Sequence, residues 1–271
     1  MTAAEPSSAR IAESLLAFWA EAGVDAVLLD TPVDRIEAGR VQPPQPVARA
    51  AAPIRAAAPG QPDISAAVAE AQARAAEAQD LEQLAAAIAA FEGCPLRYEG
   101  AASKAVFCRG DPQAPLVVIG EGPGQEEDAQ GLPFVGRAGK LLDRMLAAAG
   151  LDGRVLITNT VFWRPPGNRD PTPEEQMVCR PFLERAIQLV NPRMLLLVGG
   201  PSAKSMLKTG DGILKLRGRW HEWRSTDGSL ELPAMPTLHP AFLLRTPGAK
   251  KSAWADLLTL TERLDRPERP A

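Results

Sequence analysis

Four short apolar segments from residue 115 onward alternate with segments of helical pattern, and this alternation constrains the fold more than any other feature. Few polar residues interrupt the apolar segments, which is typical of strands buried on both faces of a parallel sheet. They read PLVVIG (115–120), RVLITN (154–159), RMLLLVG (193–199) and PAMPTL (233–238). The helical patterns between them lie at 137–150, 172–190 and 200–207. The sequence therefore predicts a three-layer α/β/α fold around a central four-stranded parallel sheet.

Polar and glycine-rich segments follow three of the four predicted strands. GEGPG comes after the first strand, WRPPGNR shortly after the second, and HPAFLLR after the fourth. The carboxyl ends of parallel strands lie at one edge of the sheet, and ligands of open α/β folds bind there. We therefore expect a functional site at this edge.

The turn after the first strand, GEGPGQEED (120–128), does not match a phosphate-binding motif. Gln125 stands where a dinucleotide fingerprint requires its third glycine, and no Gly-Lys-Ser/Thr of a P-loop follows. Four carboxylates would also repel a pyrophosphate: Glu121, Glu126, Glu127 and Asp128. The last three fit an acidic first turn of a helix, with a functional role as the alternative. Glu121 follows the strand directly, and we expect its side chain to lie in the site.

The N-terminal part of the chain has a different composition. Residues 8–30 have apolar side chains at helical spacing, and 31–63 are rich in proline and alanine, which predicts a disordered linker. We therefore divide the chain into an N-terminal region, 1–63, and a folded domain, 64–271.

Capping residues predict where some helices begin and end. Within the helical segment 65–93, Asp80 is expected to cap a second helix and Gly93 to end it. Thr172 and Glu175 fit the capping box of the long helix between the second and third strands.

Charge is unevenly distributed, although the net charge is only −3. Residues 1–92 hold 13 acids and 6 bases, whereas the remainder holds 20 acids and 24 bases. A basic C-terminal part is compatible with a polyanionic partner. An ordinary solvated surface is the alternative, and charge alone does not decide between the two.

Nothing in the sequence suggests a membrane or secreted protein. No run of eighteen apolar residues occurs, and the N-terminus lacks the basic region and apolar stretch of a signal peptide. Three cysteines, Cys94, Cys108 and Cys179, are too few and too scattered for a disulfide framework. We expect a cytoplasmic monomer with no membrane partner.

Four motifs in this order resemble those of the family 4 uracil-DNA glycosylases. They are GEGPGQEEDAQGLPFVGRAGKLLDRML, ITNTVFWRPPGNRDPTPEE, LKLRG and TLHPAFLLR. The resemblance covers about residues 80–262. Two motifs, FEGCPL and WRPPGNR, are similar to those of an alphaproteobacterial branch of this family. It implies that 64–271 form a glycosylase domain, with uracil-containing DNA as the partner.

The resemblance implies a DNA repair enzyme that flips uracil out of DNA and hydrolyses its N-glycosidic bond, leaving an abasic site. These motifs place no lysine as an obvious Schiff-base nucleophile, so we expect a monofunctional glycosylase. One alternative is a protein that binds uracil-containing DNA tightly or covalently through its histidine. Another is a non-catalytic nucleic-acid-binding module.

The resemblance also assigns roles at the uracil site. Glu121 would position the attacking water and support the sugar cation, unless it only orients Asn159 or a backbone amide. Asn159 would accept from uracil N3–H and donate to O4, with a simple turn-closing role as the alternative. Phe134 would stack on the base, although a phenylalanine is more often plain core. His239 would act as a second catalytic residue by donating to uracil O2.

Further residues are expected to contact the flipped nucleotide or the DNA. Gly122 and Pro123 belong to the turn whose backbone would approach the nucleotide closely. Basic candidates for phosphate contacts are Arg164, Arg169, Lys215, Arg217, Arg219 and Arg245. Phe242 and Leu243 would belong to a loop that inserts into the duplex, or would simply pack on the sheet.

Family 4 enzymes carry a [4Fe–4S] cluster on four cysteines, and here the resemblance maps two of those positions to large aromatic residues. The four positions hold Phe91, Cys94, Trp163 and Cys179, while Cys108 lies elsewhere. Such clusters ordinarily take four thiolates. We therefore predict no cluster and no metal, and expect these four residues to pack together as a hydrophobic plug.

Overall fold

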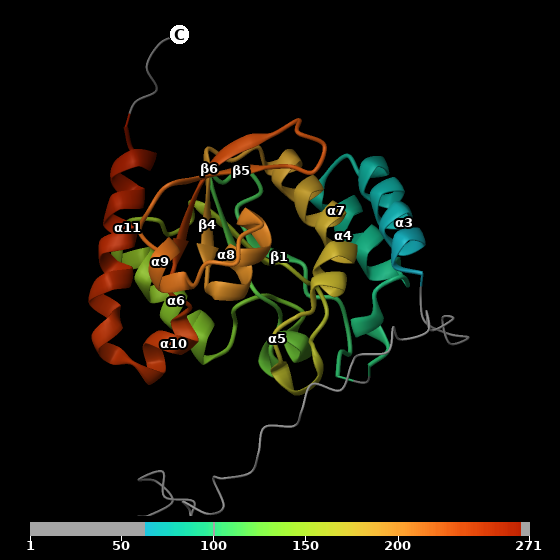
Figure 1. Cartoon of the computed structure of the whole chain (residues 1–271), viewed down its shortest axis with the longest axis horizontal. Coiled ribbons are helices and arrows are strands. Elements are labelled where there is room, and N and C mark those ends of the chain that lie inside the picture. The colour runs from blue at the N-terminus through green and yellow to red at the C-terminus, as the bar shows by residue number, and fades with distance from the viewer. Residues whose placement is uncertain (1–62, 100, 267–271) are drawn as a thin grey trace, which may run out of the picture. The chain divides into compact units, whose positions relative to one another are not determined.

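A six-stranded sheet lies at the centre of the described chain, residues 63–99 and 101–266 of a computed structural model (Figure 1). The strand order is β1-β3-β2-β4-β6-β5. The strands are β1 (Cys108–Gly110), β2 (Leu116–Gly120), β3 (Val155–Asn159), β4 (Met194–Val198), β5 (His221–Arg224) and β6 (Glu231–Thr237). The four central strands run parallel and correspond to the four predicted segments, which confirms the predicted α/β class.

The predicted count of four strands is too low, because two antiparallel strands extend the sheet at its edges. β1 pairs with β3, and β5 pairs with β6. β1 has three residues, none of them fully buried, and in β5 only Trp223 is buried. Edge strands of this kind lack the continuous apolar run that marks a strand covered on both faces.

Helices cover both faces of the sheet because alternate strand residues point to opposite sides. Along β2, Val117 and Ile119 pack into one hydrophobic cluster, whereas Leu116 and Val118 pack into another. The first cluster lies under α3, α4, α7 and α8, and the second under α6 and α11 (Figure 1). These helices are α3 (Ile64–Glu77), α4 (Leu81–Ala90), α6 (Arg137–Ala148), α7 (Pro173–Val190), α8 (Gly200–Leu207) and α11 (Lys250–Leu264).

Short helices complete the described chain. They are η1 (Pro95–Arg97), α5 (Gln125–Gln130), η2 (Pro166–Asn168), α9 (Ile213–Leu216), α10 (Pro240–Arg245) and η3 (Pro247–Ala249). In the part of the chain that is described, every helix is too short or too polar to cross a membrane.

The predicted capping residues are mostly confirmed. The Asp80 carboxylate accepts from the Gln83 amide at 2.8 Å and begins α4. Thr172 and Glu175 form the reciprocal capping box of α7. The prediction that Gly93 ends α4 is wrong, because the helix ends at Ala90 and Phe91 is its C-cap. The predictions for 8–30 and 31–62 lie outside the described residues.

The order of the strands determines where a site can form. The chain passes from β2 to β3 on one side of β2, and then to β4 on its other side. This change from one side of β2 to the other creates a topological switch point at the carboxyl end of β2. Open α/β sheets have their binding crevice at such a point. Glu121 is the first residue after β2, and it lies at this point.

Candidate active site

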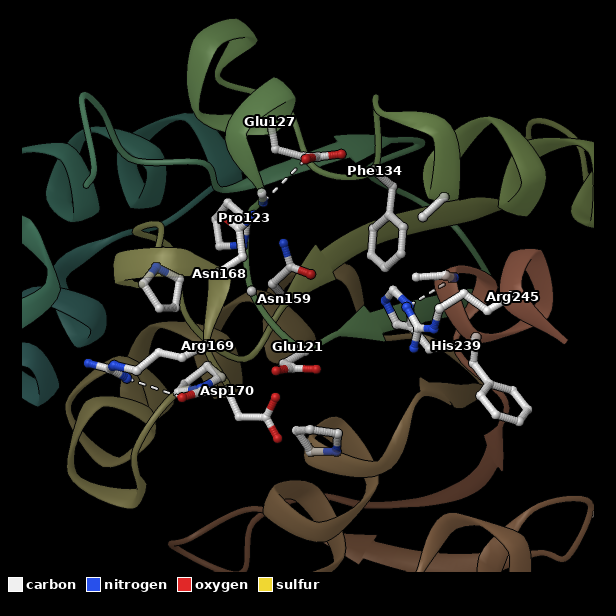
Figure 2. Close-up of a pocket in the computed structure, with 18 residues that line it drawn as sticks. Glu121, Pro123, Glu127, Phe134, Asn159, Asn168, Arg169, Asp170, His239 and Arg245 are labelled. Carbon is white, nitrogen blue, oxygen red and sulfur yellow. Dashed lines mark hydrogen bonds between the residues drawn. The ribbon is translucent and has the colours of Figure 1, made fainter. Parts of the chain in front are cut away.

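A cavity of about 620 Å³ opens at the carboxyl ends of the parallel strands (Figure 2). It brings together all five residues that were predicted to act on the base or the bond, and Pro123 with them. They are Glu121, Gly122, Phe134, Asn159 and His239. Arg169 and Arg245 also line the cavity, together with Asp170, which the sequence analysis did not single out.

Two glycines, which have no side chain, leave the space that Phe134 occupies at the cavity. A Cβ atom at Gly120 would lie 2.4 Å from the ring, and one at Gly139 would lie 1.7 Å from the Phe134 carbonyl oxygen. Phe134 itself has a positive φ of 54°, which is uncommon for a residue with a side chain. The ring also packs into the second hydrophobic cluster, so Phe134 is a core residue that lines the cavity as well, and its stacking on a base stays a prediction.

Asn159 ends β3 and is almost fully buried, with 1% of its surface exposed. Among residues 63–99 and 101–266, its Oδ1 is the one buried side-chain oxygen or nitrogen without a hydrogen-bond partner. An unsatisfied buried acceptor costs on the order of 1–3 kcal/mol. Its side chain points into the cavity (Figure 2), so a ligand with an N–H group could satisfy it.

His239 presents a neutral imidazole to the cavity. Its Nδ1 accepts from the Ala241 amide at 3.2 Å, so the ring proton is placed on Nε2. Burial, aided by the charge of Arg245 and opposed by Glu127, lowers the pKa of His239 to about 4. The ring lies 5.7 Å from the Phe134 ring, centroid to centroid. His239 is thus an N–H donor at neutral pH, directly beside the aromatic face.

Glu121 is half-buried at the base of the cavity. Its carbonyl oxygen accepts from Thr160 Oγ1 at 2.6 Å, which anchors the turn to the chain after β3. Burial raises the pKa of the Glu121 carboxyl to about 8, and a hydrogen bond and charge repulsion from Asp170 add to this rise. A carboxyl group with such a pKa can take up or release a proton near neutral pH.

The acidic residues after the turn form the first turn of α5, as one of the two interpretations predicted. Glu127 accepts from the amides of Gly124, at 3.2 Å, and of Val135 and Gly136, both at 2.9 Å. Asp128 accepts from the Ser103 amide at 2.7 Å. Glu127 therefore also ties the loop that carries Phe134 to the start of α5, which the sequence pattern did not indicate.

The basic candidates for DNA contact differ in their surroundings. Arg169 is bound by both carboxylate oxygens of Glu175, at 2.6 and 2.9 Å, and by Glu99 at 3.0 Å. Arg217 lies between helices and binds the buried carboxylate of Asp256. Arg245 lines the cavity, and the structure records no ion pair for it with any described residue. Arg164 and Lys215 lie outside the cavity lining; Arg164 donates to Asn168 at 2.7 Å and Lys215 to Asp211 at 2.9 Å.

The segment after His239 was predicted as a loop but forms the short helix α10, and part of it packs into the core. Leu243 is fully buried and packs with Leu238 and Ala253. Phe242 lines the cavity, and Leu244 is exposed. Leu243 is therefore a core residue, packed against Leu238, which follows β6, and Ala253 of α11, whereas insertion into the duplex stays a prediction for Phe242.

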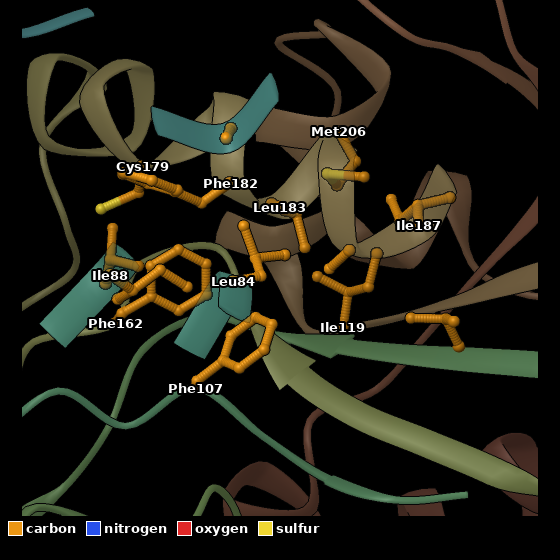
Figure 3. Close-up of a cluster of buried hydrophobic side chains, with 14 of the residues drawn as sticks. Leu84, Ile88, Phe107, Ile119, Phe162, Cys179, Phe182, Leu183, Ile187 and Met206 are labelled. Atoms are coloured by element: carbon orange, nitrogen blue, oxygen red, sulfur yellow. The ribbon is translucent and has the colours of Figure 1, made fainter. Parts of the chain in front are cut away.

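The four positions that the resemblance assigns to cluster ligands lie together in the first hydrophobic cluster, at most 2% exposed. The sulfur atoms of Cys94 and Cys179 are 3.9 Å apart, and the Phe91 and Trp163 ring centroids are 6.4 Å apart. Cys179 belongs to the first hydrophobic cluster, part of which is drawn in Figure 3. In the described part of the chain, no three side chains of His, Cys, Asp or Glu are grouped as metal ligands. Two thiols do not fit a [4Fe–4S] cluster, which needs four.

Several known proteins are similar to this chain in sequence. Residues 107–258 match the family model of the uracil DNA glycosylase superfamily. A type-4 uracil-DNA glycosylase of Sulfurisphaera tokodaii is 38% identical over 173 residues, which cover 62% of this chain and 78% of the relative. One of Thermotoga maritima is 41% identical over 155 residues, covering 56% and 77% respectively. One of Pyrobaculum aerophilum is 35% identical over 184 residues, covering 66% and 91%.

Proposed function

Since the chain belongs to the uracil DNA glycosylase superfamily, we propose that it removes uracil from DNA by hydrolysing the N-glycosidic bond, which leaves an abasic site. It is a monofunctional DNA repair glycosylase. The observation that carries this proposal is the buried, unpartnered Oδ1 of Asn159 beside an aromatic ring and a neutral histidine. A flipped uracil offers the matching N–H group.

Base recognition is assigned to Asn159. Its Oδ1 accepts from uracil N3–H, and its Nδ2 donates to O4. Cytosine presents an acceptor at N3 and a donor at N4. The Oδ1 acceptor would then face another acceptor, and the Nδ2 donor would face another donor. Sites that hydrogen-bond the correct substrate in this way discriminate by roughly 10⁴.

Departure of the base is assigned to His239 and Phe134. The Nε2–H of His239 donates to uracil O2, where negative charge accumulates as the C1′–N1 bond breaks. Phe134 stacks on the base, which contributes about 1–3 kcal/mol. The lowered pKa of His239 supports a neutral donor, because the ring stays unprotonated at neutral pH.

Hydrolysis is assigned to Glu121. Its carboxylate positions the attacking water and stabilises the positive charge of the sugar. Gly122 and Pro123 form the wall that the nucleotide approaches, since Gly122 has no side chain to obstruct it.

Contacts with the DNA backbone are assigned to cationic side chains around the cavity. Arg245 is the best placed of the candidates, since it lines the cavity beside His239. Arg169 and Arg164 lie in or near the proline-rich loop, whereas Lys215 is exposed and pairs with Asp211 outside the cavity lining. Arg217 is already bound to Asp256, which favours a structural role for it.

A protein that only traps uracil-containing DNA is the alternative. A covalent bond through His239 would require an unprotonated nitrogen facing the sugar, but Nδ1 is occupied by the Ala241 amide and Nε2 carries the proton. A uracil-containing oligonucleotide treated with alkali after incubation separates the two functions. Strand breakage at uracil is expected for the glycosylase, whereas a stable shifted complex without breakage would support the binder.

The proposal includes loss of the iron–sulfur cluster. Aromatic rings at two ligand positions and a buried packing of all four residues support it. Protein purified anaerobically is expected to be colourless and free of iron; about four irons per chain would contradict the proposal.

Two further parts of the proposal concern the whole protein. We expect it to act as a monomer, because the residues assigned to the reaction come from one chain. A cytoplasmic location accords with activity on DNA. Light scattering of the purified protein, alone and with DNA, measures the oligomeric state.

A further inference from the structure

Asp170 faces Glu121 in the cavity, and neither the family motifs nor the assigned chemistry gives it a role. We propose that Asp170 is a positioning residue for Glu121, and that the two carboxyl groups form a pair that holds one proton and releases it when the enzyme becomes active. This inference rests on the proposed function, because it concerns the group that activates the water.

The geometry of the pair comes from two loops that meet in the cavity. Glu121 follows β2, and Asp170 lies between η2 and α7. Both side chains line the cavity, and Figure 2 shows the two carboxyl groups facing one another. Two ionised carboxylates that face one another repel and have no donor between them, so the pair is more stable with one proton between the two groups.

The other charged groups of the cavity do not neutralise the pair. Arg169 precedes Asp170 in the chain, but its guanidinium is bound by Glu175 and Glu99. Glu127 is engaged with the amides of the Phe134 loop. The two remaining groups, Arg245 and the neutral His239, lie together on the other side of the cavity (Figure 2). Arg180, Lys204 and Lys208 line the adjoining groove, which Asp170 also lines, but among the described residues no ion pair joins a cation to either carboxyl group of the pair. The like charge of Asp170 therefore acts on Glu121.

The consequence for catalysis follows from the proton balance. Water forms a bond to C1′ while the C1′–N1 bond breaks and its electron pair leaves with uracil. The water proton passes to the Glu121 carboxylate, so Glu121 must be ionised before the step. Because burial and Asp170 together hold the pKa of Glu121 at about 8, excision should become faster as the pH rises towards that value.

The test is the pH dependence of single-turnover excision with saturating enzyme, using uracil-containing oligonucleotide. In Asp170→Asn the negative charge is removed and an amide can donate to Glu121, so the ascending limb should move by about one pH unit to lower pH. Asp152→Asn makes the same chemical change at an exposed turn outside the cavity and should leave the limb in place. Glu121→Gln should remove the limb.

The outcomes separate this inference from the proposed function. If the unmodified protein excises uracil and the Asp170→Asn limb coincides with the unmodified one, the pairing is wrong and the glycosylase function stands. A lower rate at every pH with an unshifted limb would also overturn the pairing, because it would mean that Asp170 only supports the loop. No excision by the unmodified protein at any pH would instead refute the function. A ¹³C NMR titration of the Glu121 carboxyl in both proteins gives the same comparison without catalysis.

Discussion

Asn159 and His239 face the same cavity with opposite hydrogen-bonding states. Asn159 Oδ1 is left without a partner by the described chain, whereas His239 Nδ1 is occupied by a backbone amide. Among the described residues, Asn159 Oδ1 is therefore an acceptor with no donor. The hydrogen bond to Nδ1 fixes the His239 ring, so that Nε2–H can donate. The unpartnered Oδ1 of Asn159 destabilises the free protein, and a hydrogen bond from a bound uracil would remove this penalty.

Replacing Asn159 by aspartate tests the recognition of uracil. The carboxylate cannot donate to O4, so uracil excision should fall by at least about 100-fold and discrimination against cytosine should weaken. The ratio of kcat/KM for uracil and cytosine oligonucleotides measures this. Asn191→Asp, at the exposed C-cap of α7, should change neither value. Unchanged selectivity in Asn159→Asp would remove Asn159 from the reading of the base.

His239 should also make stability depend on pH. Its pKa is about 4 in the folded protein and near the ordinary histidine value of 6.5 in the unfolded protein, so only the unfolded state binds the proton between these values. Stability from this group is therefore complete above pH 6.5 and is lost as the pH falls towards 4. The loss between pH 7 and pH 5 should be about 2 kcal/mol.

Urea unfolding of the unmodified protein and of His239→Gln at both pH values isolates this contribution. Other groups titrate equally in both proteins, so the difference between the two pH effects belongs to His239. Equal losses of stability in the two proteins would show that the folded imidazole is not held neutral.

At the scale of elements, the hydrophobic plug packs helices α3 and α4 against the rest of the domain. Phe91 is the C-cap of α4, and it packs against Phe182 of α7 and against Trp163, which follows β3. Cys94 and Cys179 complete the contact. Packing of this kind can fasten α3 and α4 to the core without any metal, since two large rings bury extensive apolar surface.

Truncating the plug should therefore destabilise the fold. Trp163→Ala is expected to lower the free energy of unfolding by about 3–5 kcal/mol, because it leaves a cavity in a site that is 2% exposed. Trp254 on α11 is 37% exposed, and its replacement by alanine should cost much less. Equal losses in the two variants by chemical denaturation would contradict a packed plug.

The sequence predicted the elements best where burial leaves a continuous pattern. Each of the four parallel strands contains an apolar run, and the ends of these runs predicted that Glu121, Asn159 and His239 lie at one edge of the sheet. The short edge strands β1 and β5 carry no such run and escaped prediction.

Side-chain pairs that form between distant elements could not be predicted from a local pattern. Arg217 was expected to contact phosphate, yet it binds Asp256, which is 39 positions later in the chain. Asp170 lies within the motif ITNTVFWRPPGNRDPTPEE, but its place beside Glu121 depends on how two loops meet. Both contacts are tertiary, and each changes the chemistry of the residue concerned.

At the scale of the whole molecule, a protein with a net charge of −3 must bind a polyanion through local positive charge. A second groove adjoins the cavity, and the two share Asp170, Pro171 and Pro201. Arg180, Lys204 and Lys208 line this groove and outnumber its single acid, Asp170. Within 63–99 and 101–266, no carboxylate forms an ion pair with any of these three cations. We expect the DNA strand next to the flipped uracil to leave the cavity along this groove.

Neutralising two of these cations should weaken DNA binding without affecting the chemistry. In the double variant Lys204→Gln/Lys208→Gln, the slope of log Kd against log salt should fall by about 1–2, since each lost phosphate contact removes about 0.7–0.9. The single-turnover rate with saturating enzyme should stay unchanged, because neither lysine lines the uracil cavity. Arg154→Gln/Arg224→Gln is the matched control: Arg154 directly precedes β3, and Arg224 pairs with Glu231 at the start of β6, so both lie at the opposite edge of the parallel strands. If the control lowers the salt slope as much as the lysine variant does, DNA does not follow the groove and the attraction is spread over the whole surface.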